Sequence, residues 1–94
     1  MTTRAAPTEL EIQDWCRQYL AGVLRRPIAK IDPAAKFDSL GLDSAESVFL
    51  ASALEDWIGV PLHAEAAMDH PNIAALSRFV HETIAANQGP ATGR

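Results

Sequence analysis

One serine in this chain stands where a covalent modification of its hydroxyl would be favoured. Residues 37–50 read FDSLGLDSAESVFL, and Ser44 lies between a glycine-bearing turn and an apolar segment. Gly41 can adopt the backbone geometry of a sharp turn, and Asp43 with Glu46 has the spacing of an N-cap and its capping box. These residues predict Ser44 at the first helical position, beside unpaired backbone N–H groups that favour a phosphodiester on its hydroxyl. A capped helix start whose serine has no role is the alternative that these residues alone leave open.

Helices are expected to position this serine, because apolar residues recur at spacings of three and four in three parts of the chain. The first helix is expected to open at Thr8 and the second to cover residues 44–58. A short helix is expected over residues 64–68, and a last one begins at residue 71 or 72. The pattern predicts an all-α fold, a small four-helix bundle with a long first loop over residues 27–40 and a short third helix.

The same spacing predicts which side chains form the core. The residues expected to face inward are Ile12, Trp15, Cys16, Tyr19, Leu20 and Val23 in the first helix, Leu50, Ala53, Leu54, Trp57 and Ile58 in the second, and Ile73, Leu76, Phe79, Val80 and Ile84 in the last, with Ile28, Ile31, Phe37 and Leu40 pinning the loop. Flexible tails are expected over residues 1–7 and 87–94. The domain itself is expected over residues 8–86.

The bulk composition indicates one small globular domain. The chain has 94 residues, a hydrophobic content of 48% and a single cysteine, Cys16. One cysteine excludes an internal disulfide framework and is typical of a reducing compartment. No apolar run approaches the roughly 20 residues that cross a bilayer. These properties predict a cytoplasmic location, a monomer and no association with membranes.

The charges are distributed unevenly along the chain. The net charge is −4, and no lysine or arginine occurs between Lys36 and Arg78. The acidic residues of that interval are Asp38, Asp43, Glu46, Glu55, Asp56, Glu65 and Asp69. Nucleic-acid binding is disfavoured, because phosphate backbones need a basic face. A basic protein partner at the second helix is favoured instead, and a merely solvated acidic surface is the alternative.

Catalysis by this chain is disfavoured. A hydrolase would use Ser44 as nucleophile with His63, His70 or His81 as base, but the serine lacks the Gly-x-Ser-x-Gly elbow. The histidines and the cysteine have no metal-ligand spacing either. We therefore expect neither catalytic residues nor a metal site.

The stretch around Ser44 resembles the phosphopantetheine attachment site of acyl carrier proteins, in which Gly-Leu-Asp-Ser precedes the second helix. The match continues through Val48, Leu50, Leu54, Glu55, Ile58 and the run Gly59-Val60-Pro61-Leu62, and it resumes at Asp69-His70-Pro71-Asn72-Ile73-Ala74-Ala75-Leu76. This last segment is similar to the last-helix opening of carrier domains in modular polyketide synthases. The resemblance covers roughly residues 9–84.

The resemblance implies a non-catalytic carrier with a covalent cofactor. A phosphopantetheinyl transferase would move phosphopantetheine from coenzyme A onto Ser44, with Asp43 as the flanking helix cap. The thiol of the arm would then hold acyl groups as thioesters. The implied partners are this transferase, an acyl-loading enzyme or ligase, and a ketosynthase, acyltransferase or other acyl-processing enzyme.

The face of the second helix around Ser44 is expected to bind these partners. The residues expected to take part are Glu46, Val48, Phe49, Ser52, Glu55 and Asp56. Val48, Ser52 and Glu55 follow Ser44 at near-helical spacing and share its side of the helix. For Phe49 two interpretations remain open: an exposed aromatic anchor that selects an enzyme, or a core residue that packs against the loop over residues 27–40.

Three positions indicate which kind of carrier this is. Peptidyl carrier domains usually have a second glycine where this chain has Leu42, and fatty-acid carriers differ from it at Ala45 and Phe49. With the Asp-His-Pro segment, this favours a freestanding carrier in polyketide or specialised lipid biosynthesis. The alternatives are a peptidyl or aminoacyl carrier protein, and a non-carrier helical protein-interaction module that uses the second helix as an acidic docking face.

Overall fold

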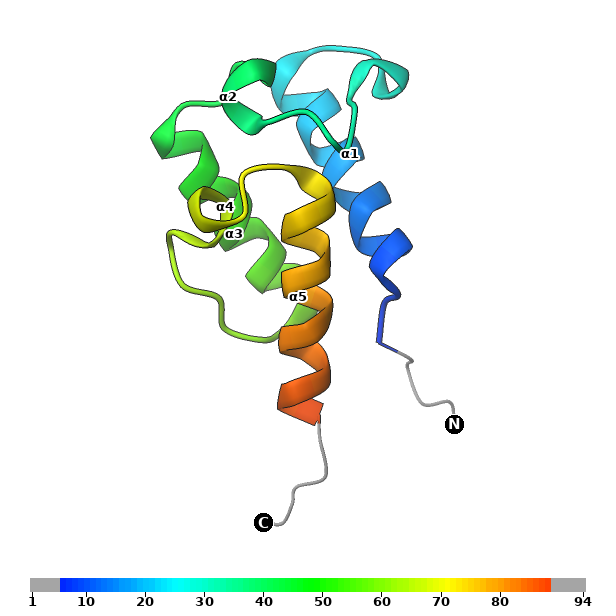
Figure 1. Ribbon diagram of the computed structural model, residues 1–94, viewed down its shortest axis with the longest axis vertical. Helices are drawn as coiled ribbons and strands as arrows, with labels where there is room; N and C mark the ends of the chain where they lie inside the picture. The colour runs from blue at the N-terminus through cyan, green and yellow to red at the C-terminus, as the bar shows by residue number, and fades with distance from the viewer. Residues whose placement is uncertain (1–5, 89–94) are drawn as a thin grey trace.

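Helices make up the regular structure of residues 6–88, the part of the chain that the computed structural model describes. The elements in chain order are α1 (Glu9–Leu24), the 3₁₀ helix η1 (Ile28–Lys30), α2 (Phe37–Leu40), α3 (Ser44–Ile58), α4 (Ala66–Asp69) and α5 (Ile73–Gln88). Figure 1 shows α1 and α5 running along the molecule, with α3 and the short α4 beside them. The predicted all-α bundle is therefore confirmed, and the expected long loop contains the additional single turns η1 and α2.

The first helix begins where its capping residues predict. The Thr8 hydroxyl accepts the Glu11 N–H at 3.1 Å, and the Glu11 carboxylate accepts the Thr8 N–H at 2.8 Å, so both halves of the capping box form. The buried face carries Ile12, Cys16 and Leu20, as expected. The inward placement of Val23 is wrong: it is 40% exposed, because the last turn of α1 extends past the start of α5, the helix on which α1 packs (Figure 1).

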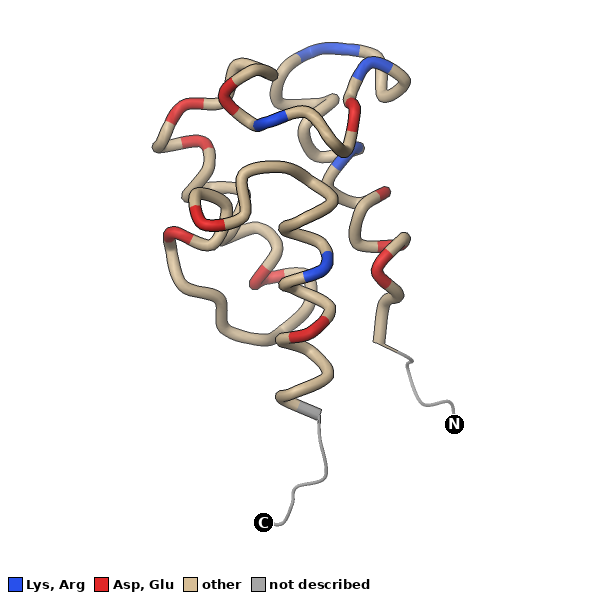
Figure 2. The backbone as a smooth tube through the Cα atoms, in the orientation of Figure 1, with Lys and Arg blue, Asp and Glu red and all other residues tan. Residues whose placement is uncertain are grey.

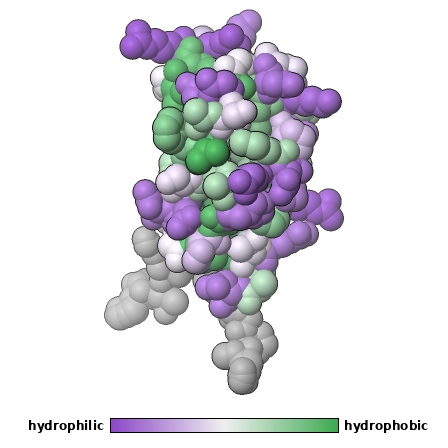
Figure 3. Space-filling model, turned by 90° about the vertical axis from the view of Figure 1, so that its left-hand side faces the viewer, coloured by the Kyte–Doolittle hydropathy of each residue, from purple (hydrophilic) through white to green (hydrophobic). Residues whose placement is uncertain are grey.

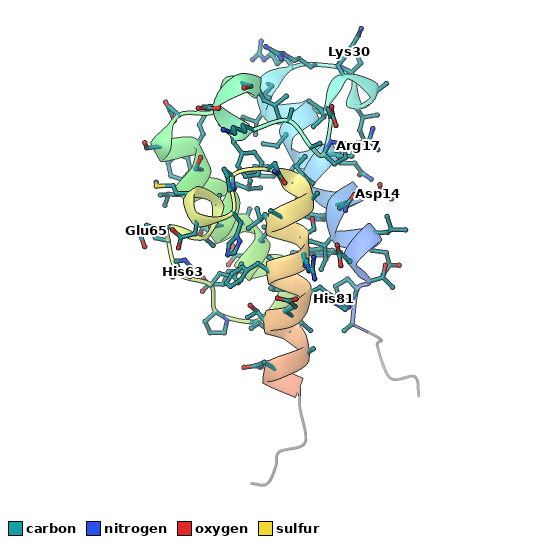
Figure 4. All side chains as sticks on the ribbon, viewed as in Figure 1. Asp14, Arg17, Lys30, His63, Glu65 and His81 are labelled. Atoms are coloured by element: carbon teal, nitrogen blue, oxygen red, sulfur yellow. The ribbon has the colours of Figure 1, made fainter. Side chains whose placement is uncertain are left out.

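The long connection is fastened to the bundle by side-chain and backbone bonds. Arg17 of α1 donates from Nε to the Ile31 carbonyl oxygen and from a terminal nitrogen to the Ile28 carbonyl oxygen, both at 3.1 Å. Figure 4 shows Arg17 beside the loop that carries Lys30. Ile31, Phe37 and Leu40 are buried as predicted. Ile28 is not, because η1 turns its side chain to the surface.

The second long helix has the predicted bounds. Helix α3 runs from Ser44 to Ile58 and ends at Gly59, whose φ of 73° is a left-handed conformation that glycine adopts without strain. Leu50 and Leu54 are fully buried. Trp57 was expected to face inward, but it is half-exposed.

Trp57 lies at the surface, where its ring on α3 contacts an aromatic ring of α1. Its ring stacks on that of Trp15 with 5.1 Å between the ring centroids, and Trp15 stacks on Tyr19 at 5.3 Å. Offset aromatic stacking of this kind stabilises a contact beyond the area that it buries. The three rings therefore join the two helices although only part of their surface is covered.

The last two helices differ from expectation only at their ends. Helix α4 covers Ala66–Asp69 instead of residues 64–68, and α5 continues through residues 87 and 88, which were expected in the tail. Residues 6 and 7 of the expected N-terminal tail are half-buried, and Ala6 packs against the core. The remaining tail residues, 1–5 and 89–94, lie outside the described residues. Of the residues expected to face inward in α5, Ile73, Leu76, Val80 and Ile84 are buried and Phe79 is half-buried. Within residues 6–88, no helix is long and apolar enough to cross a membrane.

The core contains the chain's one thiol, as predicted. Cys16 is fully buried in α1, and this burial raises the pKa of its thiol from 9.0 to about 12. The nearby Ser77 hydroxyl favours the ionised thiol and opposes this rise of the pKa only in part. The thiol is therefore protonated in the folded protein across the neutral range.

This buried thiol predicts a loss of stability at alkaline pH. Between pH 9 and about 12 the Cys16 thiol ionises in the unfolded chain but stays protonated in the folded one. The free energy of unfolding should therefore fall as the pH rises, by up to about 1.4 kcal/mol per pH unit for one proton. Urea unfolding of the wild type and Cys16→Ala at pH 8 and pH 10.5 measures this, and the variant should lose less stability over that interval. Equal losses in the two proteins would contradict the prediction.

Candidate attachment site

Ser44 is held at the first position of α3 by the residues that precede it. Gly41 ends α2 with φ at 101°, a conformation that other residues rarely adopt. Leu42 then enters the core, and Asp43 is extended. The Asp43 carboxylate accepts the Glu46 N–H at 2.8 Å, which makes it the N-cap. Ser44 itself is exposed, as the sequence predicted.

The predicted capping box at this helix forms only in part. Asp43 caps the Glu46 N–H, but within residues 6–88 the Glu46 side chain returns no bond to the backbone of Asp43. The contrast with Thr8 and Glu11, which bond in both directions, shows that the spacing alone does not settle the side-chain geometry. The Glu46 carboxylate is consequently available at the surface.

A pocket of about 300 Å³ opens beside Ser44. It lies between α2, the start of α3, and α4, and its lining residues are Lys36, Phe37, Asp38, Leu42, Asp43, Ser44, Ser47, Ala67, Met68 and Pro71. Lys36 is the cation of this set. Ser47, one turn after Ser44, is a buried polar residue with 7% of its surface exposed.

Of the ten pocket residues, only Asp43 and Ser44 were predicted as site residues. In the sequence, Lys36 only marks where the acidic interval begins, and Ser47 has no predicted role. The helical spacing of Ser44 and Ser47 could have indicated that they share a face. The pocket wall from α4 could not be read from spacing, because it depends on the tertiary placement of that helix.

The arrangement that a hydrolase would need, with a histidine beside Ser44, does not form among the described residues. His63 bonds Asp69 at 2.9 Å, His70 stacks on Phe79 with centroids 4.3 Å apart, and His81 is exposed on α5 (Figure 4). None of these histidines lines the pocket at Ser44. Among the described residues, no group of three acidic, histidine or cysteine side chains could hold a metal ion.

Phe49 and its neighbours form the exposed face of α3. Phe49 is 61% exposed, so its interpretation as a core residue is wrong. Ser52 and Asp56 are exposed, and Glu46 and Val48 are partly buried. This surface is available to a partner.

Glu55 has a second, structural contact. Its carboxylate accepts the Leu62 N–H at 3.2 Å and so holds the segment that leads to α4. Of the six residues expected to bind partners, Glu55 therefore also supports the fold.

The charges and the apolar surface are organised around this site. Figure 2 shows the acidic residues over α2, α3 and the loop to α4, and several basic residues at the end where α1 leads into η1. The face turned to the viewer in Figure 3 carries hydrophobic side chains surrounded by hydrophilic ones. Phe49 and Met68, both large and exposed, supply apolar surface on α3 and α4. A partner that matches this side needs basic residues around an apolar centre.

Comparison with known sequences identifies the family. A family model described as "Phosphopantetheine attachment site" matches residues 14–80. The acyl carrier protein TtuC of Teredinibacter turnerae is 34% identical over 73 residues, which cover 78% of this chain and 84% of that protein. The phenolphthiocerol synthesis polyketide synthase Pks15/1 of Mycobacterium marinum is 38% identical over 69 residues, which cover 72% of this chain but 3% of that synthase.

Solved structures share the fold. A free-standing peptidyl carrier protein from Acinetobacter baumannii has a TM-score of 0.74 and 30% identity, covering 79% of this chain and 92% of that one. The HMG-ACPI domain of the CurA module from Lyngbya majuscula has a TM-score of 0.77 and 26% identity, and the match covers 93% of this chain and 89% of that domain's chain. The chain therefore belongs to the phosphopantetheine-attachment family. It is a carrier protein of the polyketide-synthase type, and carrier domains of this family are not catalysts.

The residues at Ser44 fit the cofactor that the family attaches. The hydroxyl is exposed at a helix start, where free backbone N–H groups favour an anion. Lys36 supplies a positive charge in the adjoining pocket. A phosphodiester on Ser44 would therefore be favoured by the N–H groups and by Lys36, which offset the neighbouring Asp38 and Asp43 carboxylates.

The two residues at the helix start should differ in their effect on stability. Asp43→Ala removes the cap of α3 and should lower the free energy of unfolding by about 0.5–2 kcal/mol. Ser44→Ala removes an exposed hydroxyl and should change it by less than about 0.5 kcal/mol. Urea unfolding at neutral pH measures both. A larger loss for Ser44→Ala than for Asp43→Ala would show that the cap is not the determinant of this helix start.

Proposed function

We propose that Ser44 is the residue to which phosphopantetheine is attached, and that the arm holds acyl or polyketide intermediates as thioesters. The observation that carries this proposal is the exposed Ser44 hydroxyl at the first position of α3, beside a pocket that is lined in part by the cationic side chain of Lys36. The other serines in the range matched by the family differ from it. Ser47 and Ser77 are buried, and Ser39 and Ser52 are exposed within helices rather than at a helix start.

The protein would contribute display and recognition, and the arm would supply the reactive thiol. Asp43 fixes the first turn of α3, so the attachment oxygen keeps one position relative to the docking surface. The buried Cys16 thiol is protonated at neutral pH and would not compete with the thiol of the arm for acyl groups.

We propose that partners dock on the surface formed by Glu46, Val48, Phe49, Ser52, Glu55 and Asp56. These partners are a phosphopantetheinyl transferase that draws on coenzyme A, an acyl-loading enzyme or ligase, and a ketosynthase, acyltransferase or other acyl-processing enzyme. The absence of Lys and Arg from residues 37–77 supports a basic partner surface. Exposed ion pairs contribute only about 0.2–1 kcal/mol each, so Phe49 is expected to provide the larger share of affinity.

The pathway assignment depends on the relatives. An acyl carrier protein and polyketide synthases stand among the similar sequences, which favours polyketide or specialised lipid biosynthesis over a peptidyl carrier role. Cytoplasmic location and a monomeric state stay predictions, supported by the single cysteine and the acidic surface. A non-carrier interaction module would have the same surface but would gain no mass from coenzyme A.

Modification at Ser44 is directly testable. Incubation of the apo protein with coenzyme A and a broad-specificity phosphopantetheinyl transferase should add one phosphopantetheine mass to the wild type. Intact-mass analysis should find no addition to Ser44→Ala. Ser52→Ala, which removes another exposed hydroxyl of α3, is the matched control and should be modified like the wild type. A mass gain in Ser44→Ala would assign the attachment to a different residue.

The anchor role of Phe49 predicts a defect confined to partner recognition. Phe49→Ala should leave the free energy of unfolding within about 0.5 kcal/mol of the wild type, because the ring is 61% exposed. It should lower kcat/KM for acyl transfer from the loading enzyme about fivefold or more, as expected for an interface anchor. Leu10→Ala, on the 70% exposed Leu10 of α1, is the control and should leave transfer unchanged. Equal transfer rates for both variants would contradict the anchor role.

A further inference from the structure

The pocket of about 300 Å³ begins at the attachment residue itself, because Ser44 is one of its lining residues. Any group joined to the Ser44 side chain therefore starts at the wall of this pocket. A volume near 300 Å³ is at the small end of ligand sites, which suits part of a flexible chain better than a whole drug-sized molecule.

Part of the pocket lining is apolar. Phe37, Leu42 and Ala67 are buried core residues that contribute to the lining, and Met68 and Pro71 are exposed at it. This surface can cover a small branched hydrocarbon group. Methionine adapts its shape to such contacts because its side chain has three rotatable bonds.

The lining also contains the hydroxyl of Ser47, a residue that is itself largely buried. Within residues 6–88 the Ser47 hydroxyl makes no hydrogen bond, unlike Thr83, whose hydroxyl donates to the Phe79 carbonyl oxygen at 2.8 Å. The residue is 7% exposed, and its oxygen is not enclosed in the core but stays accessible from the pocket. A hydroxyl that faces a pocket loses its contact with water when a ligand enters, so the ligand must offer it a hydrogen bond in exchange. A hydrocarbon chain there would leave Ser47 unpaired, whereas a hydroxyl or amide would satisfy it.

The charges of the lining assign a role to Lys36. Asp38 and Asp43 contribute two carboxylates, which oppose an anion at Ser44, and Lys36 is the cation of the lining that offsets them. The Asp43 carboxylate is in addition occupied by the Glu46 N–H. A phosphodiester on Ser44 therefore depends on Lys36 for a nearby countercharge.

We propose that this pocket holds the proximal half of the phosphopantetheine arm, with its phosphodiester beside Lys36, its hydroxyl or first amide against Ser47, and its geminal methyl groups on Leu42, Ala67 and Met68. The inference rests on the proposed attachment at Ser44. It separates two parts of the ligand: the pocket binds the arm, and the acyl group beyond the distant thiol stays outside. The arm would then have a resting position on the carrier, from which a partner must withdraw it.

NMR of the holo protein tests this directly. The sample is ¹³C,¹⁵N-labelled protein loaded from unlabelled coenzyme A, with intact mass confirming the attached arm. Isotope-filtered NOE spectra should connect the geminal methyl protons of the arm to Leu42, Ala67 and Met68. An arm that is attached by mass but has no such contacts would overturn the pocket and leave the proposed function intact. A protein that gains no mass would refute the proposed function instead.

Matched variants test the two polar residues. Ser47→Ala should lower the ratio of pocket-bound to free arm about two- to twelvefold, which is the range that one net hydrogen bond supports. The measurement is the difference between the holo and apo chemical shifts of the Ala67 amide. Ser52→Ala is its control. Lys36→Gln should reduce the same shift and move the ³¹P resonance of the phosphodiester, whereas Lys30→Gln, on η1 and outside the pocket, should do neither.

A last sample distinguishes the arm from its cargo. With a butyryl group on the thiol, the contacts of the geminal methyl groups should persist and the butyryl chain should show none with the pocket. Butyryl contacts that replace those of the arm would overturn the inference. Unchanged amide shifts in both Ser47→Ala and Lys36→Gln would overturn the roles of these two residues.

Discussion

The hydrogen bond from the Glu46 N–H to the Asp43 carboxylate sets where α3 begins, and the presentation of Ser44 depends on it. Packing fixes the register on both sides of this bond. Leu42, two residues before Ser44, is in the core, and Ser47, three residues after it, is buried against the pocket. With these neighbours held inside, the first turn of α3 leaves the Ser44 hydroxyl outside. The exposure of the candidate attachment oxygen is thus a consequence of buried contacts around it rather than of a loose surface loop.

The rest of the pocket depends on bonds between segments far apart in the chain. The Phe37 N–H donates to the Pro71 carbonyl oxygen at 2.8 Å, and the Ala74 N–H donates to the Pro33 carbonyl oxygen at 3.0 Å. These bonds join the loop before α2 to the start of α5 and place Lys36 and Pro71 in one lining. Backbone groups paired in this way resist displacement, because an unpaired buried N–H or C=O is costly. The long connection is therefore a fixed wall of the site.

Local patterns predicted the features that local interactions determine. The caps at Thr8 and Asp43 and the bounds of α3 all follow from residues within one helical turn. The patterns failed where the tertiary arrangement decides. Spacing assigned Val23 and Trp57 to the interior, but neither helix has a neighbour that covers its last turn fully. Spacing also left Phe49 undecided, since a position at the edge of a buried stripe becomes core or surface according to where the next element packs. The pocket at Ser44 needed α4 in place before it could be recognised.

The Glu55 carboxylate belongs to the acidic face of α3 and also supports the fold, which restricts the ion pairs that this face can form with a partner. Glu55 accepts the Leu62 N–H and thereby anchors the segment leading to α4, whose Ala67 and Met68 line the pocket at Ser44. A cation that drew Glu55 away would release that bond, and an exposed ion pair returns only about 0.2–1 kcal/mol. Glu46 and Asp56 have no comparable side-chain bond within residues 6–88, so a basic partner can pair with them without disturbing α4. Electrostatic recognition on the proposed docking surface is therefore expected to rest on Glu46 and Asp56, while Glu55 keeps the pocket wall in place beneath it.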